Sequence, residues 1–77
     1  MWILGTMDAQ LFTLTNAENP NQVFAWGMQI TAGDDVEAVV YRRDPITRRT
    51  MFGVHNSAED ALARYGGSRD LALQWEN

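Results

Sequence analysis

The feature that most constrains this chain is a β-rich segment, residues 36–55, that one turn interrupts and a capped helix follows. The segment reads VEAVVYRR, then DPIT, then RRTMFGVH. In the turn, Asp44 can accept hydrogen bonds from the turn's own backbone, and Pro45 suits the second turn position, which needs φ near −65°. β-Branched and aromatic residues fill both flanks. The segment therefore predicts a β-hairpin.

The sequence leaves the register of this hairpin open. A three-residue closure pairs Val40 with Phe52, whereas a four-residue closure pairs Val39 with Phe52. A slip of one residue exchanges the two faces of a strand, and both faces here carry apolar side chains. This double character indicates an interior strand of a sheet.

The residues after the hairpin predict a short helix over about residues 58–66. Ser57 with Asp60, or equally Asn56 with Glu59, has the spacing of a helix cap. An apolar stripe follows at i, i+3, i+4 and i+7: Ala58, Ala61, Leu62 and Tyr65. A helix of about nine residues is too short to persist alone, so this stripe is expected to pack on a sheet.

Residues 23–31 show the strongest alternation and predict a strand before the hairpin. Its large apolar residues share one face: Phe24, Trp26, Met28 and Ile30. We expect Leu62 and Tyr65 to pack on that face. Gly27 indicates a bulge or a close approach by a neighbour. The middle of the chain is thus expected to form a three-stranded meander.

Weaker signals lie at the two ends. Residues 2–6 predict a short strand, residues 7–9 a turn and residues 10–15 another strand. Gly66-Gly67 is expected to supply the left-handed residue that ends the helix. Residues 68–76 alternate as a final strand, although Ser68 could instead cap a short helix.

Length and composition fit one small domain. The 77 residues (1–77) are expected to form an α+β fold, in which an antiparallel sheet of four to six strands carries one short helix on one face. Cysteine is absent, so disulfides and thiolate metal sites cannot stabilise the chain. Three Trp, three Phe and two Tyr are therefore expected to supply the bulk of the core.

The sequence contains no recognisable catalytic or metal motif. His55 is the only histidine, and its neighbour Ser57 has a more direct role as a helix cap. The acidic group Asp34, Asp35 and Glu37 lacks the spacing of a calcium loop and is expected to be a solvated turn. We expect no enzyme activity, no cofactor and no bound metal. No stretch approaches the ~20 apolar residues needed to span a bilayer, and no signal peptide is visible, so a cytoplasmic protein without membrane contact is expected.

Arginines flanking the hairpin turn are the strongest functional signal. Arg42, Arg43, Arg48 and Arg49 are four of six basic residues in a chain of net charge −4. Tyr41 lies just behind them. Such a tip can bind carboxylates or phosphates bidentately, while a simpler role is to keep a hairpin from aggregating.

We therefore expect a small non-enzymatic module, an inhibitor or adaptor, that binds a protein partner through the arginine tip. The alternative is a nucleic-acid-binding module that uses the same tip, although the negative net charge disfavours a general nucleic-acid binder. A homodimer is a further expectation, with Trp2, Leu4 and Trp75 as candidate interface residues.

Overall fold

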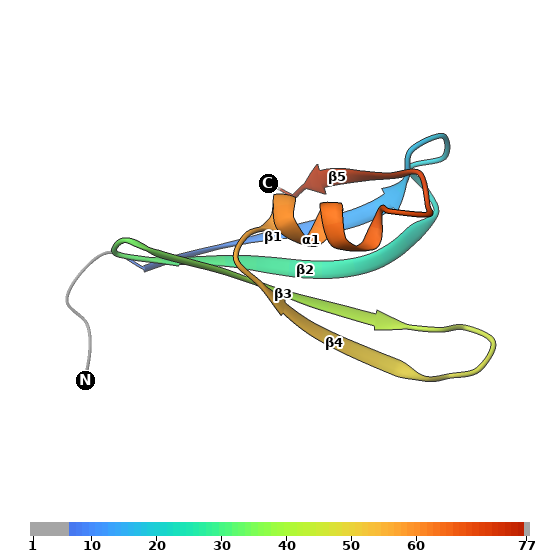
Figure 1. Cartoon of the computed structure of the whole chain (residues 1–77), viewed down its shortest axis with the longest axis horizontal. Helices are drawn as coiled ribbons and strands as arrows, with labels where there is room; N and C mark the ends of the chain where they lie inside the picture. Colours follow the sequence, from blue (N-terminus) through green and yellow to red (C-terminus); the bar gives the residue numbers. More distant parts are fainter. Residues whose placement is uncertain (1–6, 77) are drawn as a thin grey trace.

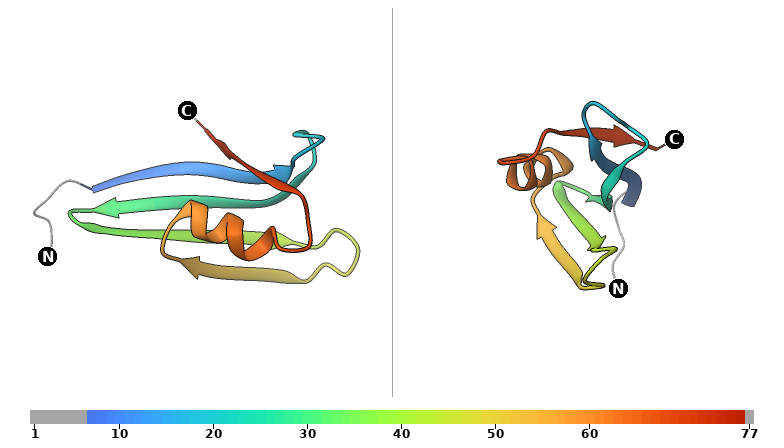
Figure 2. Two further views of the ribbon diagram at one scale, coloured as in Figure 1. Left: turned by 45° about the horizontal axis from the view of Figure 1, so that its top comes forward. Right: turned by 90° about the vertical axis from the view of Figure 1, so that its right-hand side faces the viewer.

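The computed structural model describes residues 7–76, which form a five-stranded antiparallel sheet with one helix (Figure 1). In chain order the elements are β1 (Met7–Asn16), β2 (Val23–Ala32), β3 (Asp35–Arg43), β4 (Thr50–His55), α1 (Ala58–Tyr65) and β5 (Leu71–Trp75). The strand order is β4-β3-β2-β1-β5. Strands β1 to β4 form a meander, and the chain then returns through α1, on one face, to place β5 beside β1 (Figure 2). The expected α+β fold is confirmed.

The first strand is longer than the sequence indicated. Residues 7–9 continue the ladder with β2, in which Met7 pairs with Ala32 and Ala9 with Ile30. The turn expected at residues 7–9 is therefore wrong, because pairing with the neighbouring strand decides the conformation of a segment with weak local preference. The strand expected at residues 2–6 lies outside the described residues.

The final segment is a strand, which confirms the first of the two alternatives. Strand β5 pairs antiparallel with β1, with Leu73 opposite Leu14 and Trp75 opposite Phe12. The Trp75 and Phe12 rings meet edge to face with centroids 5.6 Å apart. Trp75, one of the residues expected at a dimer interface, is thus half-buried beside the core, while Trp2 and Leu4 lie outside the described residues.

The hairpin register differs from both expected closures. Val39 pairs with Val54, and Tyr41 pairs with Phe52. The loop is longer than a tight turn because β3 ends at Arg43 and β4 begins at Thr50. Strand β3 is an interior strand, as expected, whereas β4 forms one edge of the sheet.

The cap at the start of α1 is confirmed, and the helix ends before Gly66 as expected, but the expected left-handed residue there is wrong. The Ser57 hydroxyl accepts a hydrogen bond from the Asp60 N–H at 3.0 Å. At the other end Gly66 has φ −85°, and its N–H donates to the Leu62 carbonyl at 2.8 Å. This bond continues the helical turn by one residue, so no left-handed residue is needed there.

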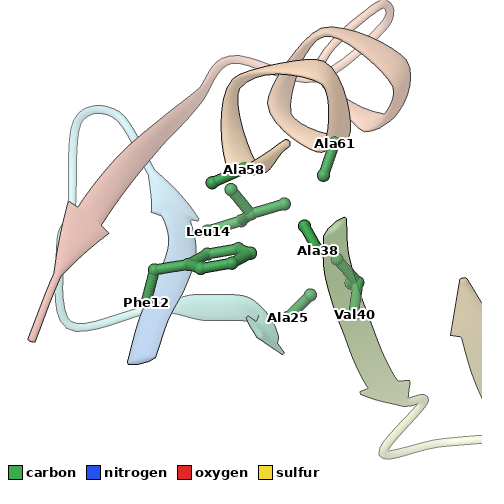
Figure 3. Packing of buried hydrophobic residues seen from close by; sticks show 7 residues of the cluster. All are labelled: Phe12, Leu14, Ala25, Ala38, Val40, Ala58 and Ala61. Atoms are coloured by element: carbon green, nitrogen blue, oxygen red, sulfur yellow. The ribbon is translucent and has the colours of Figure 1, made fainter. Parts of the chain in front are cut away.

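The core lies between α1 and one face of the sheet, here called the inner face (Figure 3). It consists of seven buried residues: Phe12, Leu14, Ala25, Ala38, Val40, Ala58 and Ala61. Alanines on both the helix and the sheet allow the two backbones to approach closely. Among the aromatic residues in the described chain, Phe12 alone is fully buried. The expectation that aromatic side chains form the bulk of the core is therefore wrong.

The helix covers the opposite face of β2 from the one expected. Ala25 is buried under α1, whereas Trp26 is half-exposed on the far side of the sheet. Phe24 is the exception, because the register of β1 and β2 shifts between Leu14 and Thr15 and leaves Phe24 without a partner on β1. The Phe24 ring reaches the helix side of the sheet, where its centroid lies 6.1 Å from the centroid of the Tyr65 ring. The expected packing therefore holds for Phe24 and fails for Trp26 and Met28.

Gly27 marks a close approach by a neighbouring side chain. Of the two expectations for this glycine, a bulge or a close approach, the second is confirmed. A Cβ atom at this position would fall on the ring of Phe12, which is paired with Gly27 across β1 and β2. Phe12 is 1% exposed and cannot move away without disturbing the core.

We expect Gly27→Ala to destabilise the protein by about 1–3 kcal/mol, the usual cost of overpacking a well-packed core. The matched control is Gly67→Ala, because a Cβ atom there meets no atom within 4 Å. That variant should be neutral or gain up to ~1 kcal/mol by restricting the unfolded chain. Urea unfolding of both variants checks this, and equal stabilities would contradict the packing described.

Candidate functional site

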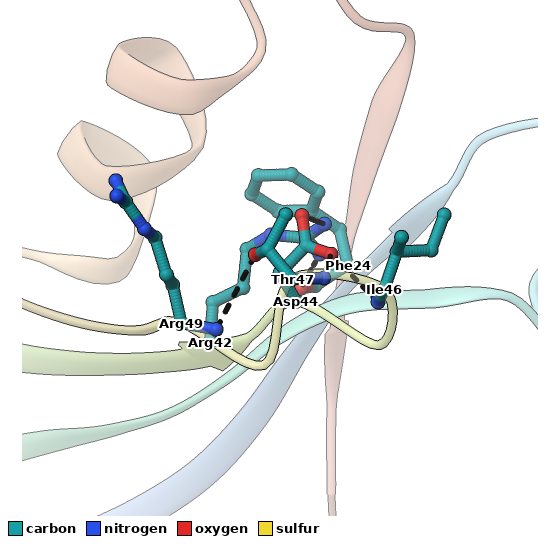
Figure 4. A network of polar contacts seen from close by, with 6 residues as sticks. All are labelled: Phe24, Arg42, Asp44, Ile46, Thr47 and Arg49. Atoms are coloured by element: carbon teal, nitrogen blue, oxygen red, sulfur yellow. Dashed lines mark hydrogen bonds and ion pairs between the residues drawn. The ribbon is translucent and has the colours of Figure 1, made fainter.

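The loop between β3 and β4 is held by hydrogen bonds to Asp44 (Figure 4). Its carboxylate accepts from the N–H groups of Ile46 at 2.8 Å and Thr47 at 3.0 Å, as the sequence indicated. The Asp44 carbonyl accepts from the Arg48 N–H, and the Asp44 N–H donates to the Arg49 carbonyl, at 2.9 and 2.8 Å. These bonds give the loop a fixed shape at the end of the hairpin.

The same bonds lower the pKa of the Asp44 carboxyl below its ordinary value. The backbone N–H of Thr47 contributes most, followed by that of Ile46, and the positive charge of Arg42 adds to the effect. Each of these interactions favours the ionised carboxylate. Asp44 therefore serves the loop as an anion.

Arg42 is fixed against β2 rather than free at the tip. Its Nη1 donates to the Phe24 carbonyl at 2.6 Å, and its guanidinium lies 4.1 Å from the centre of the Phe24 ring (Figure 4). The ion pair with Asp44 is long, at 4.0 Å, and partly exposed, so it adds little stability. Arg42 thus presents its remaining donors in one fixed orientation.

Arg69 joins this group from the segment between α1 and β5. Its guanidinium lies 4.7 Å from the centre of the same Phe24 ring. Sequence reasoning missed Arg69, because it lies 27 positions beyond Arg42 and no local pattern connects them. Only the return of the chain beside β1 brings the two arginines together.

A hollow of about 640 Å³ opens beside this pair of arginines. Its walls include Phe24, Arg42, Arg43, Arg69 and Asp70. Three of these five side chains are cationic and one is anionic. The hollow is therefore a site where an anionic group would find several guanidinium donors.

Of the predicted site residues, Arg42 and Arg43 line the hollow, but the whole set does not share one surface. Arg49 extends on the side of the sheet that carries α1 (Figure 4), whereas alternation along β3 places Arg43 and Tyr41 on the opposite face. Tyr41 packs edge to face against Phe52, with centroids 5.8 Å apart, and is not part of the hollow. Arg48 is exposed and has φ +66°, a left-handed conformation that costs a non-glycine residue about 1–2 kcal/mol.

The acidic residues Asp34, Asp35 and Glu37 lie around the turn between β2 and β3, at the other end of β3 from the arginines (Figure 1). All three are exposed. Within residues 7–76, no cluster of three or more His, Cys, Asp or Glu residues is placed to hold a metal ion. The sheet thus has a basic end and an acidic end.

His55 has a partner that accounts for its position. Its Nε2 is hydrogen-bonded to the Tyr65 hydroxyl at 2.8 Å, and the two rings meet edge to face at 5.1 Å. The pair ties β4 to the end of α1.

In the described part of the chain, no helix has the length and apolar character required to cross a lipid bilayer.

No family model, curated protein or solved structure matches this chain.

Asp44 provides a pH test of the loop. Because its folded pKa is lowered, its stabilising effect is fully present above the ordinary pKa of 3.8 and is lost as the pH falls through the folded value. We expect the difference in melting temperature between the wild type and Asp44→Ala to be largest at neutral pH and to shrink below about pH 4. Asp44→Asn keeps an acceptor oxygen without the charge and should be intermediate. A carboxyl titration by NMR that gives Asp44 an ordinary pKa would contradict this reading of the loop.

Proposed function

We propose that this chain is a small protein-binding module, and that its basic end binds carboxylate groups of a protein partner. The observation that carries the proposal is the convergence of Arg42 and Arg69, from distant parts of the sequence, over the ring of Phe24 beside an open hollow. An inhibitor or adaptor of another protein would act in this way.

Guanidinium groups fixed in place suit carboxylates. A guanidinium offers five N–H donors in a planar fork that matches the two oxygens of a carboxylate. Stacking on Phe24 and the bond to its carbonyl hold Arg42 before any partner arrives, so less side-chain entropy is lost on binding. A cation–π contact with an aromatic ring typically contributes about 0.5–1 kcal/mol at exposed sites. This contact leaves the N–H donors of Arg69 available to a partner.

The conformation of Arg48 also supports a binding role. Glycine would adopt φ +66° without strain, yet an arginine occupies the position. Strained residues occur most often where the side chain serves a function. Arg48 is exposed at the tip of the loop that borders the hollow.

A protein partner fits this surface better than a nucleic acid does. The chain has ten acidic and six basic residues, and its acidic end would be repelled by a phosphate backbone that runs along the sheet. A binding site confined to one end needs only a compact group of carboxylates. Nucleic acid is thus the competing outcome of the test.

The first test compares Arg69→Ala with Arg64→Ala. Both remove one exposed arginine, but only Arg69 lies over Phe24 and lines the hollow. Tagged wild type and variants are used to capture proteins from nuclease-treated lysate of the source organism, and the affinity for the captured protein is measured. Arg69→Ala should lose about 10–100-fold in affinity, the value of a hydrogen bond to a charged group. Arg64→Ala should bind like the wild type, and equal losses in both variants would overturn the proposal.

Arg48→Gly separates binding from folding. It should keep or raise the melting temperature, because glycine relieves the left-handed strain, and it should weaken partner binding. Arg69→Lys keeps the charge but loses the planar fork, so it should restore only part of the affinity. Capture that disappears on nuclease treatment, with a steep salt dependence, would favour a nucleic-acid ligand instead.

A further inference from the structure

The face of the sheet opposite α1, here called the outer face, is apolar over four strands. Paired residues on neighbouring strands share a face, so two rows run across it. One row is Leu11, Met28, Val39 and Val54, and the other contains Trp26, Tyr41 and Phe52. No helix or strand in residues 7–76 covers these rows (Figure 2).

These large apolar side chains are more exposed than is usual on a protein surface. Phe52 is 71% exposed, Val54 64%, Leu11 57% and Trp26 50%. Aromatic side chains present on the order of 150–250 Å² each, so Phe52 and Trp26 alone leave roughly 200–300 Å² uncovered. The largest apolar patch of a typical monomer is about 300–600 Å² and is often functional. The outer face therefore has the character of an interface.

Its dimensions match those of a small dimer interface. Four strands about 4.8 Å apart, and the nine residues of β3 rising about 3.3 Å each, give a face of roughly 19 Å by 26 Å. That is about 500 Å² per copy before the relief of the side chains is counted. Two copies would bury on the order of 1,000 Å², the size at which specific interfaces begin.

The charges along β3 select a second copy of this chain as the occupant. The outer face of β3 reads Glu37, Val39, Tyr41, Arg43: one acid, two apolar residues and one base. Both charged residues are exposed, and the one ion pair in residues 7–76 joins Arg42 to Asp44 instead. When two copies of β3 run in opposite directions, the acid of one faces the base of the other, so the strand is complementary in charge to its own copy.

We propose that two copies pack outer face to outer face about a two-fold axis that crosses the strands between the two apolar rows. Each strand then opposes its own copy in the antiparallel direction, so the Val39 row of one protomer covers the Tyr41 row of the other. Glu37 meets Arg43 of the second copy, and the contact occurs twice because a two-fold interface is isologous. An axis that runs along β3 would instead bring Arg43 to Arg43, which like-charge repulsion disfavours.

This interface adjoins the proposed partner site, because Trp26 and Arg43 also line the hollow, but the two sites are centred on different faces. The dimer interface uses the face away from α1, whereas Phe24, Arg42 and Arg69 gather at the end of the sheet on the helix side. The dimer would display two such sites, one on each protomer.

Sedimentation equilibrium of the full chain tests the dimer. The wild type should reach twice its 8.7 kDa mass as the concentration rises from micromolar to sub-millimolar. Phe52→Glu should remain at the monomer mass. Ile46→Glu is the matched control, because Ile46 is 87% exposed but lies in the loop beyond the apolar rows, and it should dimerise like the wild type. A monomeric wild type, or a dimer that survives Phe52→Glu, would overturn the proposal.

Charge reversal tests the arrangement. Glu37→Arg alone and Arg43→Glu alone should each weaken the dimer by about tenfold or more, since each brings like charges together twice. The double variant should regain the wild-type affinity. Melting temperatures should stay unchanged, because both side chains are exposed. Failure of the double variant to regain dimerisation would overturn the antiparallel arrangement. Partner capture through Arg69 is a separate readout, so the two proposals can fail independently.

Discussion

The contact between α1 and the small side chains of the sheet decides how the rest of this molecule is arranged. Ala58 and Ala61 of the helix share one buried cluster with Ala25 and Ala38 of the sheet, while the Phe12 ring fills the space left by Gly27. A helix of eight residues has little surface to bury, so it gains most where it can approach the sheet closely. Close packing is possible only on the face with small residues. The larger apolar side chains of β2 must therefore lie on the other face.

That choice of face links the core to both proposed interfaces. Because α1 covers Ala25, alternation along β2 directs Trp26 and Met28 outward, where they join the exposed side chains of β3 and β4. The register shift beside Leu14 turns Phe24 back to the helix side. There it becomes the platform on which Arg42 and Arg69 lie. One helix placement and one irregularity in a ladder thus determine where both the apolar surface and the basic site are found.

The separation of charge along β3 affects both interfaces. Glu37 and the acidic turn lie at one end, and Arg43 and the hairpin arginines lie at the other. For a foreign partner, this polarity orients the approach of an acidic surface toward the basic end. For a second copy, it fixes the relative direction of the strands. A chain with the same net charge distributed evenly would show neither preference.

Local patterns in the sequence determined the elements of this fold, and long-range packing determined its faces. The hairpin, the Ser57 cap and the alternation of β5 depend on neighbours within a few residues, so they were readable in advance. The register of the hairpin could not be predicted from the sequence, because the Asp44 hydrogen bonds close a loop longer than either expected turn. The sequence also could not predict which side of the sheet α1 covers, since in β2 and in β3 either face of the strand has side chains that suit a core. The arginines at the hairpin could be named from their spacing, but Arg69 reaches Phe24 only because the chain crosses the sheet after α1 and pairs β5 with β1. A periodic sequence pattern tells which residues share a face, and only the packing energy of the folded chain selects which face is buried.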